Sequence, residues 1–122
     1  MIYKILRLPE WEAALPENVF LGSADDLRDG FIHFSTREQV AGTVGKYFSD
    51  ETELIIVSVN EMDLAEALKW EASRNGALFP HLYAELPLGL VSDALFVHRE
   101  AGTPFVWPDD PLEGGTEGLL PG

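Results

Sequence analysis

Apolar residues recur along this chain with two different periods, and the shorter period indicates strands. Residues 2–7 alternate between two faces, with Ile2, Lys4 and Leu6 on one of them. Residues 54–59 form a nearly unbroken β-branched run, which is typical of a strand buried on both faces. The expected strands are residues 2–7, 31–35, 54–59, 79–86, 90–97 and, at a sheet edge, 103–107.

The longer period, near 3.6 residues, indicates a helix that starts at about residue 36. Thr36 and Gln39 make a capping box, and Ser35 with Glu38 is an equally good frame one residue earlier. The buried face of this helix is expected to hold Val40, Val44, Tyr47 and Phe48.

Weaker patterns predict shorter helices. Pro9 suits the first position of a helix that ends at Pro16, and its apolar stripe is Trp11, Ala14 and Leu15. A short helix is expected over residues 23–27. Asn60 can cap a helix over residues 61–68, whose inward residues are expected to be Met62, Ala65 and Leu68. Residues 69–73 fit either the end of that helix or a short extended segment.

Strands and helices alternate in the first half of the chain, and strands dominate the second half. This order predicts an α+β fold with a mixed, mainly antiparallel sheet and two or three helices. We expect a single globular domain over residues 1–107. Residues 108–122 are rich in Pro, Gly and acidic residues, which predicts a flexible tail.

Composition narrows the classes of function. The 122 residues include no cysteine, which excludes disulfides, thiolate catalysis and cysteine-based metal sites, and fits a cytoplasmic protein. No apolar run approaches the roughly 18–20 residues of a membrane span, so no membrane association is expected. The net charge of −13 opposes binding of long nucleic acid. A small-molecule or nucleotide-like ligand is the expected partner.

Two of the three histidines lie inside the expected strands. The period of two puts His33 and Ser35 on one face of residues 31–35, and it puts His81 and Tyr83 on one face of residues 79–86. Imidazole can hydrogen-bond a ribose or a phosphate and changes its charge near neutral pH. Tyr83 or Phe79 can stack on a planar ring.

Simpler interpretations stand beside this one. Each histidine can be a packed core residue that hydrogen-bonds the backbone. Glu71, beside Trp70, is either a general base or ribose ligand, or a carboxylate paired with Lys69 or Arg74. No metal is expected, because no short-spaced pair of ligands supports a site made of the two histidines and Glu71.

Three segments together resemble a known family. They are Gly30-Phe31-Ile32-His33-Phe34-Ser35-Thr36, Lys69-Trp70-Glu71 and Phe79-Pro80-His81-Leu82-Tyr83. Together they resemble the small bacterial family catalogued as domain of unknown function 952, over about residues 1–97. The family has no established reaction to carry over.

That family is in turn similar to the ADP-ribosyltransferase-like fold, nearest to the RNA 2′-phosphotransferases, which bind NAD in a split sheet. The similarity implies His33 near the NAD ribose or phosphates, and Tyr83 or Phe79 near nicotinamide. Glu71 or His81 would be a third polar group, and Ser35, Thr36 and Lys4 would line the site. Lys4 stands where those enzymes have a histidine, and an ammonium cannot accept a hydrogen bond.

Three hypotheses follow: an enzyme that transfers ADP-ribose or processes an NAD derivative, a module that binds a nucleotide-like ligand without chemistry, and a structural domain with packed histidines. The distance between His33 and His81 separates them. Beyond about 12 Å the two rings could not both touch one small ligand group, given hydrogen bonds near 3 Å.

Overall fold

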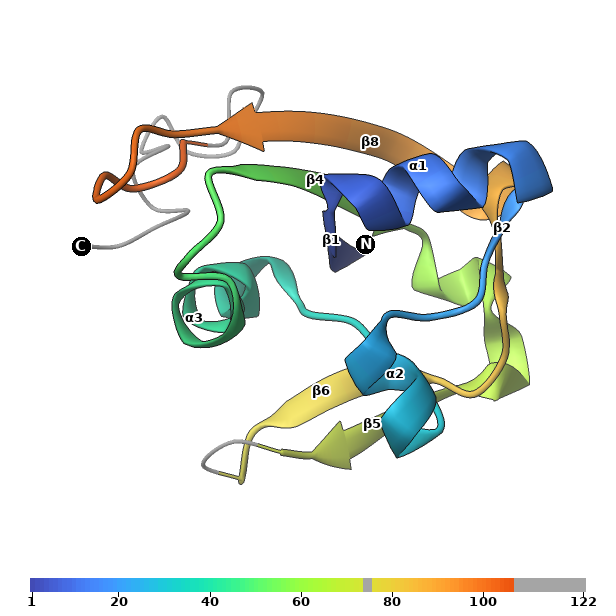
Figure 1. Ribbon diagram of the computed structural model, residues 1–122. Coiled ribbons are helices and arrows are strands. Elements are labelled where there is room, and N and C mark those ends of the chain that lie inside the picture. Colours follow the sequence, from blue (N-terminus) through green and yellow to red (C-terminus); the bar gives the residue numbers. More distant parts are fainter. Residues whose placement is uncertain (74–75, 107–122) are drawn as a thin grey trace.

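Two three-stranded antiparallel sheets frame the protein in the computed structural model, which describes residues 1–73 and 76–106 (Figure 1). The first sheet has the order β1-β4-β8, made of β1 (Ile2–Arg7), β4 (Glu53–Val59) and β8 (Val91–His98). The second has the order β3-β6-β5, made of β3 (Ile32–His33), β6 (Leu78–Leu82) and β5 (Leu68–Ala72). A short pair joins β2 (Val19–Phe20) to β7 (Leu86–Pro87).

Three α-helices lie in the described part of the chain. They are α1 (Leu8–Glu17), α2 (Ala24–Asp29) and α3 (Val40–Tyr47). In Figure 1, β4 and β8 run across the top of the view, β5 and β6 lie at the bottom, and α2 lies beside β6. Short 3₁₀ turns cover Arg37–Gln39, Glu61–Asp63, Ala65–Ala67 and Leu88–Leu90. In the part of the chain that the structure describes, no helix is both long and apolar enough to cross a membrane.

In the first sheet, β1 and β4 are buried on both faces, whereas most residues of the edge strand β8 are exposed. One face, with Ile2, Leu6 and Val57, packs against α1 and against Ile32 and Leu82 of the second sheet. The other face carries Ile5, Leu54, Ile56 and Val97. It packs on Val40 and Val44 of α3, on Phe48 directly after that helix, and on Phe105. Lys4 lies between the buried residues Ile2 and Leu6 on the same face of β1, so its side chain is held in the core, where it is 6 % exposed.

The two sheets meet at a single bridge between Tyr3 and Ser35. Each residue donates its backbone N–H to the other's carbonyl oxygen, both at 2.8 Å. The N–H of Phe34 still donates to the carbonyl of Pro80 in β6, and from Ser35 on the chain pairs with the edge of the first sheet. Residues 4–7 of that edge have no strand beside them in the described part of the chain, so a space opens there between the sheets.

The α+β prediction is confirmed, and the strands at residues 2–7 and 54–59 correspond to β1 and β4. Every strand pair in the described residues is antiparallel. The strand expected at 90–97 is β8, which begins and ends one residue later. It contains a β-bulge at Ser92, because the neighbouring residues Ser58 and Val59 of β4 pair with Asp93 and Val91. Residues 69–73 are mostly extended in β5, and the short helix at 23–27 is α2.

The helix predicted over residues 61–68 is wrong. Two 3₁₀ turns replace it, and Ala65, the first residue of the second turn, has a left-handed φ of 50°, which an α-helix cannot contain. Leu64 packs into the core, whereas Met62 is 81 % exposed. Leu64, Ala67 and Leu68 also have helical spacing. In the structure this spacing places them against the core that contains Ile2, Leu6 and Val57, without an α-helix.

Other boundaries also differ from expectation. The first helix continues through Pro16 to Glu17, and Leu15 and Tyr47 are exposed rather than packed. The strand expected over 79–86 ends at Leu82, where the N–H of Tyr83 turns to the carbonyl of Ala67.

The edge strand expected at 103–107 is absent from residues 103–106. Instead the guanidinium of Arg99 holds this segment, donating to the carbonyl of Thr103 and stacking on Phe105. Trp107 and the tail expected over 108–122 lie outside the described residues.

Candidate functional site

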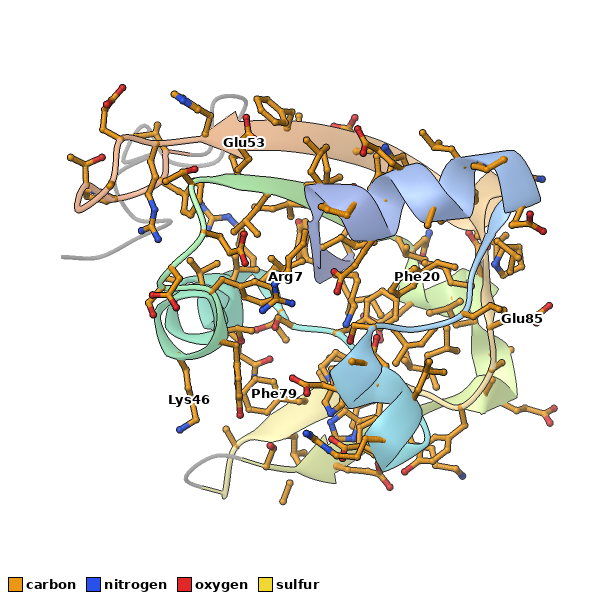
Figure 2. The ribbon with its side chains drawn as sticks, in the orientation of Figure 1. Arg7, Phe20, Lys46, Glu53, Phe79 and Glu85 are labelled. Carbon is orange, nitrogen blue, oxygen red and sulfur yellow. The ribbon has the colours of Figure 1, made fainter. Side chains whose placement is uncertain are left out.

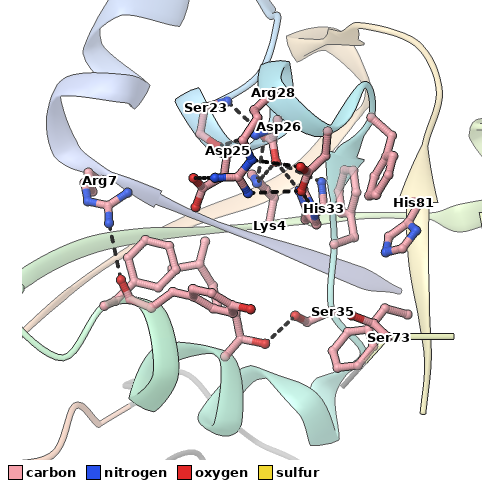
Figure 3. Close-up of a pocket in the computed structure, with 18 of the residues that line it drawn as sticks. Lys4, Arg7, Ser23, Asp25, Asp26, Arg28, His33, Ser35, Ser73 and His81 are labelled. Atoms are coloured by element: carbon pink, nitrogen blue, oxygen red, sulfur yellow. Dashed lines mark hydrogen bonds and ion pairs between the residues drawn. The ribbon is translucent and has the colours of Figure 1, made fainter. Parts of the chain in front are cut away.

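A cleft of about 280 Å³ lies beside the open edge of β1 (Figure 3). In Figure 2 the side chains of Arg7 and Phe79 point into the region between the sheets, while Lys46 points away from the molecule. The walls come from β1, α2, α3 and the second sheet. The lining residues include Lys4 and Arg7 of β1, five side chains in or beside α2, Thr43 and Tyr47 of α3, and Phe31, His33, Phe79 and His81 at the second sheet.

His33 is held by two carboxylates of α2. Its Nδ1 lies 2.6 Å from Oδ1 of Asp26, and its Nε2 lies 3.0 Å from Oδ2 of Asp29. The backbone N–H of His33 also donates to Oδ1 of Asp26, at 3.1 Å. The imidazole thus joins both turns of this short helix to β3.

Asp26 is the buried centre of these contacts. Besides His33, its carboxylate accepts from the ammonium of Lys4 at 2.9–3.0 Å and from the backbone N–H of Ser23 at 2.9 Å (Figure 3). The hydroxyl of Ser23 accepts in return from the backbone N–H of Asp26, so this pair caps α2.

The charge states around Asp26 follow from burial and from these bonds. Burial raises the pKa of Asp26, but the hydrogen bond from His33 and the charge of Lys4 outweigh it and hold the pKa well below its usual range. Burial lowers the pKa of Lys4, and Asp26 opposes that shift. The carboxylate is therefore ionised in the folded protein at neutral pH.

His81 forms a second histidine–carboxylate pair. Its Nδ1 lies 2.7 Å from Oε1 of Glu71, which also accepts from the hydroxyl of Tyr83 at 2.7 Å. The hydrogen bond with His81, and to a smaller extent the one with Tyr83, holds the pKa of Glu71 below its usual range. The bond to Glu71 raises the pKa of Tyr83. Glu71 is not paired with Lys69 in the structure, and Arg74 lies outside the described residues.

The two pairs are neighbours, because His33 and His81 are directly opposite in the β3–β6 ladder. Their ring centroids are 5.5 Å apart, inside the limit of about 12 Å for contact with one ligand group. Phe31 stacks on His81 with centroids 4.0 Å apart, and it also touches His33 and Tyr83.

The cations of the cleft have carboxylate partners. Lys4 pairs with Asp26, Arg7 with Glu51 and Glu10, and Arg28 with Asp25 and Asp29. Among the described residues, no group of three or more His, Asp and Glu side chains could hold a metal ion.

The candidate residues named from the sequence fall into three groups. Five line the cleft: Lys4, His33, Ser35, Phe79 and His81. Glu71 and Tyr83 reach it through the hydrogen bond of Glu71 to His81. Thr36 does not line the cleft but caps the turn before α3, where its hydroxyl accepts from the N–H of Gln39. Ser35, which does line the cleft, shares a hydrogen bond with the hydroxyl of Thr43 (Figure 3).

The sequence analysis missed the residues of α2 that hold His33. Asp26, Asp29 and the neighbouring Arg28 were not among its candidates. Ser23-Ala24-Asp25-Asp26 has the form of a capping box, and this signal could have identified Asp26 as a structured residue. No local signal relates Asp26 to Lys4, 22 residues away.

The comparisons with known proteins agree with this fold. The crystal structure of protein CC0527 from Caulobacter crescentus is 47 % identical to this chain, with a TM-score of 0.78 over 82 % of this chain and 88 % of that one. The solution NMR structure of CC0527 is also 47 % identical, with a TM-score of 0.73 over 82 % and 86 %. No curated protein matches the chain. A family model described as protein of unknown function (DUF952) matches residues 5–94, and the chain belongs to that family.

Proposed function

We propose that this protein is an enzyme that takes an NAD-type dinucleotide into the cleft and transfers its ADP-ribosyl group to water or to an acceptor hydroxyl. The observation that carries the proposal is the pair of histidines, each bonded to a carboxylate, side by side in one cleft. Paired titratable groups of this kind are what general acid–base chemistry requires. The choice of NAD rests on the resemblance of the sequence to the ADP-ribosyltransferase-like fold.

The size of the cleft suits part of such a ligand. Its volume of about 280 Å³ is at the lower end of small-ligand sites, which span roughly 300–1,000 Å³. It can enclose the nicotinamide and its ribose, with the remainder of the dinucleotide outside. Phe31 and Phe79 offer ring faces, and Ser35 and His81 offer polar groups for ribose hydroxyls.

The charge of the cleft also suits an anionic ligand better than the rest of the surface does. Three of the eight Lys and Arg residues of the chain line it, against three of the 21 Asp and Glu residues. These residues are Lys4, Arg7, Arg28, Asp25, Asp26 and Asp29. The cleft is therefore locally neutral in a protein of net charge −13, which reduces repulsion of a diphosphate.

The experiment is thermal unfolding and histidine NMR with millimolar NAD, ADP-ribose and nicotinamide, followed by an assay of nicotinamide release from NAD. A ligand at 100 times its Kd adds about 2.7 kcal/mol to the free energy of unfolding, which raises Tm by several degrees. His81→Asn should slow release by about 10²-fold or more, while the exposed His98→Asn is the matched control. If all three compounds leave Tm and the histidine resonances unchanged, the proposal is wrong.

A second candidate is a module that binds the same kind of ligand without reacting it. The observation in its favour is that the cations of the cleft already have carboxylate partners, so they are not poised to stabilise charge that develops in a reaction. This module would give the same ligand-induced rise in Tm with no nicotinamide release. A purely structural role for the histidines is disfavoured by the cleft that both of them line.

A further inference from the structure

The two histidines of the cleft differ in how many ring nitrogens the protein already uses. Both nitrogens of His33 face carboxylates, Nδ1 that of Asp26 and Nε2 that of Asp29. A carboxylate oxygen therefore lies within 3.0 Å of each ring nitrogen of His33. His33 therefore has no nitrogen left to take a proton from a ligand.

His81 has one nitrogen in use and one available. Nδ1 bonds to Glu71, and Nε2 has no hydrogen-bond partner among residues 1–73 and 76–106. The residue is only 5 % exposed, yet no fully buried side-chain nitrogen or oxygen in the described residues lacks a partner. Nε2 is thus in contact with solvent, and the space that His81 lines is the cleft.

Glu71 determines which nitrogen of His81 carries the hydrogen. Its Oε1 accepts from Nδ1–H of His81 and from the hydroxyl of Tyr83. Because an ionised carboxylate cannot donate, Nδ1 must be the protonated nitrogen, and the lone pair of the neutral ring is then on Nε2.

We propose that Nε2 of His81 accepts the proton of the water or acceptor hydroxyl that attacks in the cleft, and that Glu71 is its positioning residue. This inference rests on the proposed function and deepens it. As the attacking oxygen bonds to C1′ of the nicotinamide ribose, its proton moves to Nε2. The bond from C1′ to the nicotinamide nitrogen breaks, and its electron pair leaves with nicotinamide. The imidazolium formed on His81 is stabilised by the carboxylate of Glu71.

Several charged and aromatic groups surround His81. His33 and the ring of Phe31 face it from the β3 side, and Lys69 and Glu71 face it from β5. Tyr83 reaches it through Glu71, and Asp26 and Asp29 reach it through His33. Any pH profile of the site must therefore be compared with variants of these groups.

Ring ¹⁵N NMR of the ligand-free protein tests the inference without a substrate. In the wild type, His81 should carry hydrogen on Nδ1 and none on Nε2. Glu71→Gln should move the hydrogen toward Nε2, because the amide can donate to Nδ1. Tyr83→Phe removes the other partner of the same oxygen and should leave the tautomer unchanged, so it is the matched control. Hydrogen on Nε2 in the neutral wild-type ring overturns the inference.

Nicotinamide release from NAD then tests the division of roles. His81→Asn should lower kcat by about 10²–10⁴-fold, the usual contribution of general acid–base catalysis. Glu71→Gln should lower kcat and change its pH profile with little change in KM, and Glu71→Asp should recover part of the rate. A loss of kcat in His33→Asn together with an unaffected His81→Asn overturns the inference.

The two proposals fail separately. If the wild type releases no nicotinamide, the proposed function is wrong. If Nε2 of His81 carries no hydrogen in the same sample, it is still the proton acceptor of the cleft. Urea unfolding of each variant shows whether a loss of activity is caused by a loss of folding.

Discussion

Replacement of Asp26 by Asn is expected to be among the most destabilising single changes near the cleft. Asn keeps the shape of the side chain but removes the charge that faces Lys4, whose ammonium would stay buried without a counter-charge. The two side chains are 7 % and 1 % exposed. Breaking a buried ion pair on one side costs about 3–5 kcal/mol, a large share of the roughly 5–15 kcal/mol that holds a domain folded.

Urea unfolding measures this loss and offers two controls. Asp29→Asn also removes a carboxylate bonded to His33, but that group is exposed, so its loss should be clearly smaller. Adding Lys4→Met to Asp26→Asn should restore part of the stability, because no unpaired buried charge remains. The reasoning fails if Asp26→Asn costs less than about 1 kcal/mol, or if the double variant is no more stable than Asp26→Asn.

The same residue makes stability depend on pH in the acid range. The folded-state pKa of Asp26 is below its unfolded value of about 3.9. As the pH falls below about 4, the unfolded chain takes up this proton first, so the unfolded state is favoured. The stabilisation is therefore complete above that range and is lost as the pH falls toward the folded pKa. Asp26→Asn should show a shallower acid loss than the wild type.

Three further substitutions test structural claims by urea unfolding. Arg99→Met should cost about 2–3 kcal/mol, because the guanidinium donates to four backbone carbonyls; Arg99→Lys should recover little of the loss. Thr36→Ala should cost about 1 kcal/mol as a lost cap, and Thr36→Ser almost nothing. Ala65→Gly should gain about 0.5 kcal/mol, because glycine accepts the left-handed φ of 50° without steric cost. A result of opposite sign at any of the three contradicts its stated cause.

Local patterns were sufficient for the faces of the strands but not for their pairing. The period of two separated Ile32 and Phe34, both in the core, from His33 and Ser35, which line the cleft. It could not reveal that His33 lies opposite His81. The two residues are 48 positions apart in the sequence, and their pairing depends on how the elements between them fold. The sequence supplied the two histidines as candidates, and only the three-dimensional structure supplied their distance.

Tertiary packing also explains the main errors. Residues 61–68 have more than one helical frame of apolar residues, and the one chosen put Met62 inside, although the fold buries Leu64. No sequence pattern distinguishes Arg99, but its guanidinium donates to the carbonyls of Phe48 and Ser49 in the loop after α3. Such contacts depend on which backbone groups the fold leaves unpaired, and no short stretch of sequence encodes that.

The carboxylate of Asp26 caps α2, neutralises Lys4 and holds His33, and this sharing has a consequence for how the cleft can change during evolution. A substitution at Lys4 or His33 alters the environment of a charge on which folding also depends, so its effect on the site cannot be separated from its effect on stability. We expect strong epistasis among the three positions. Variation in ligand preference should therefore arise more readily at Phe79, Ser73 or Tyr47, which line the same cleft without contacting Asp26 in any hydrogen bond or ion pair described above.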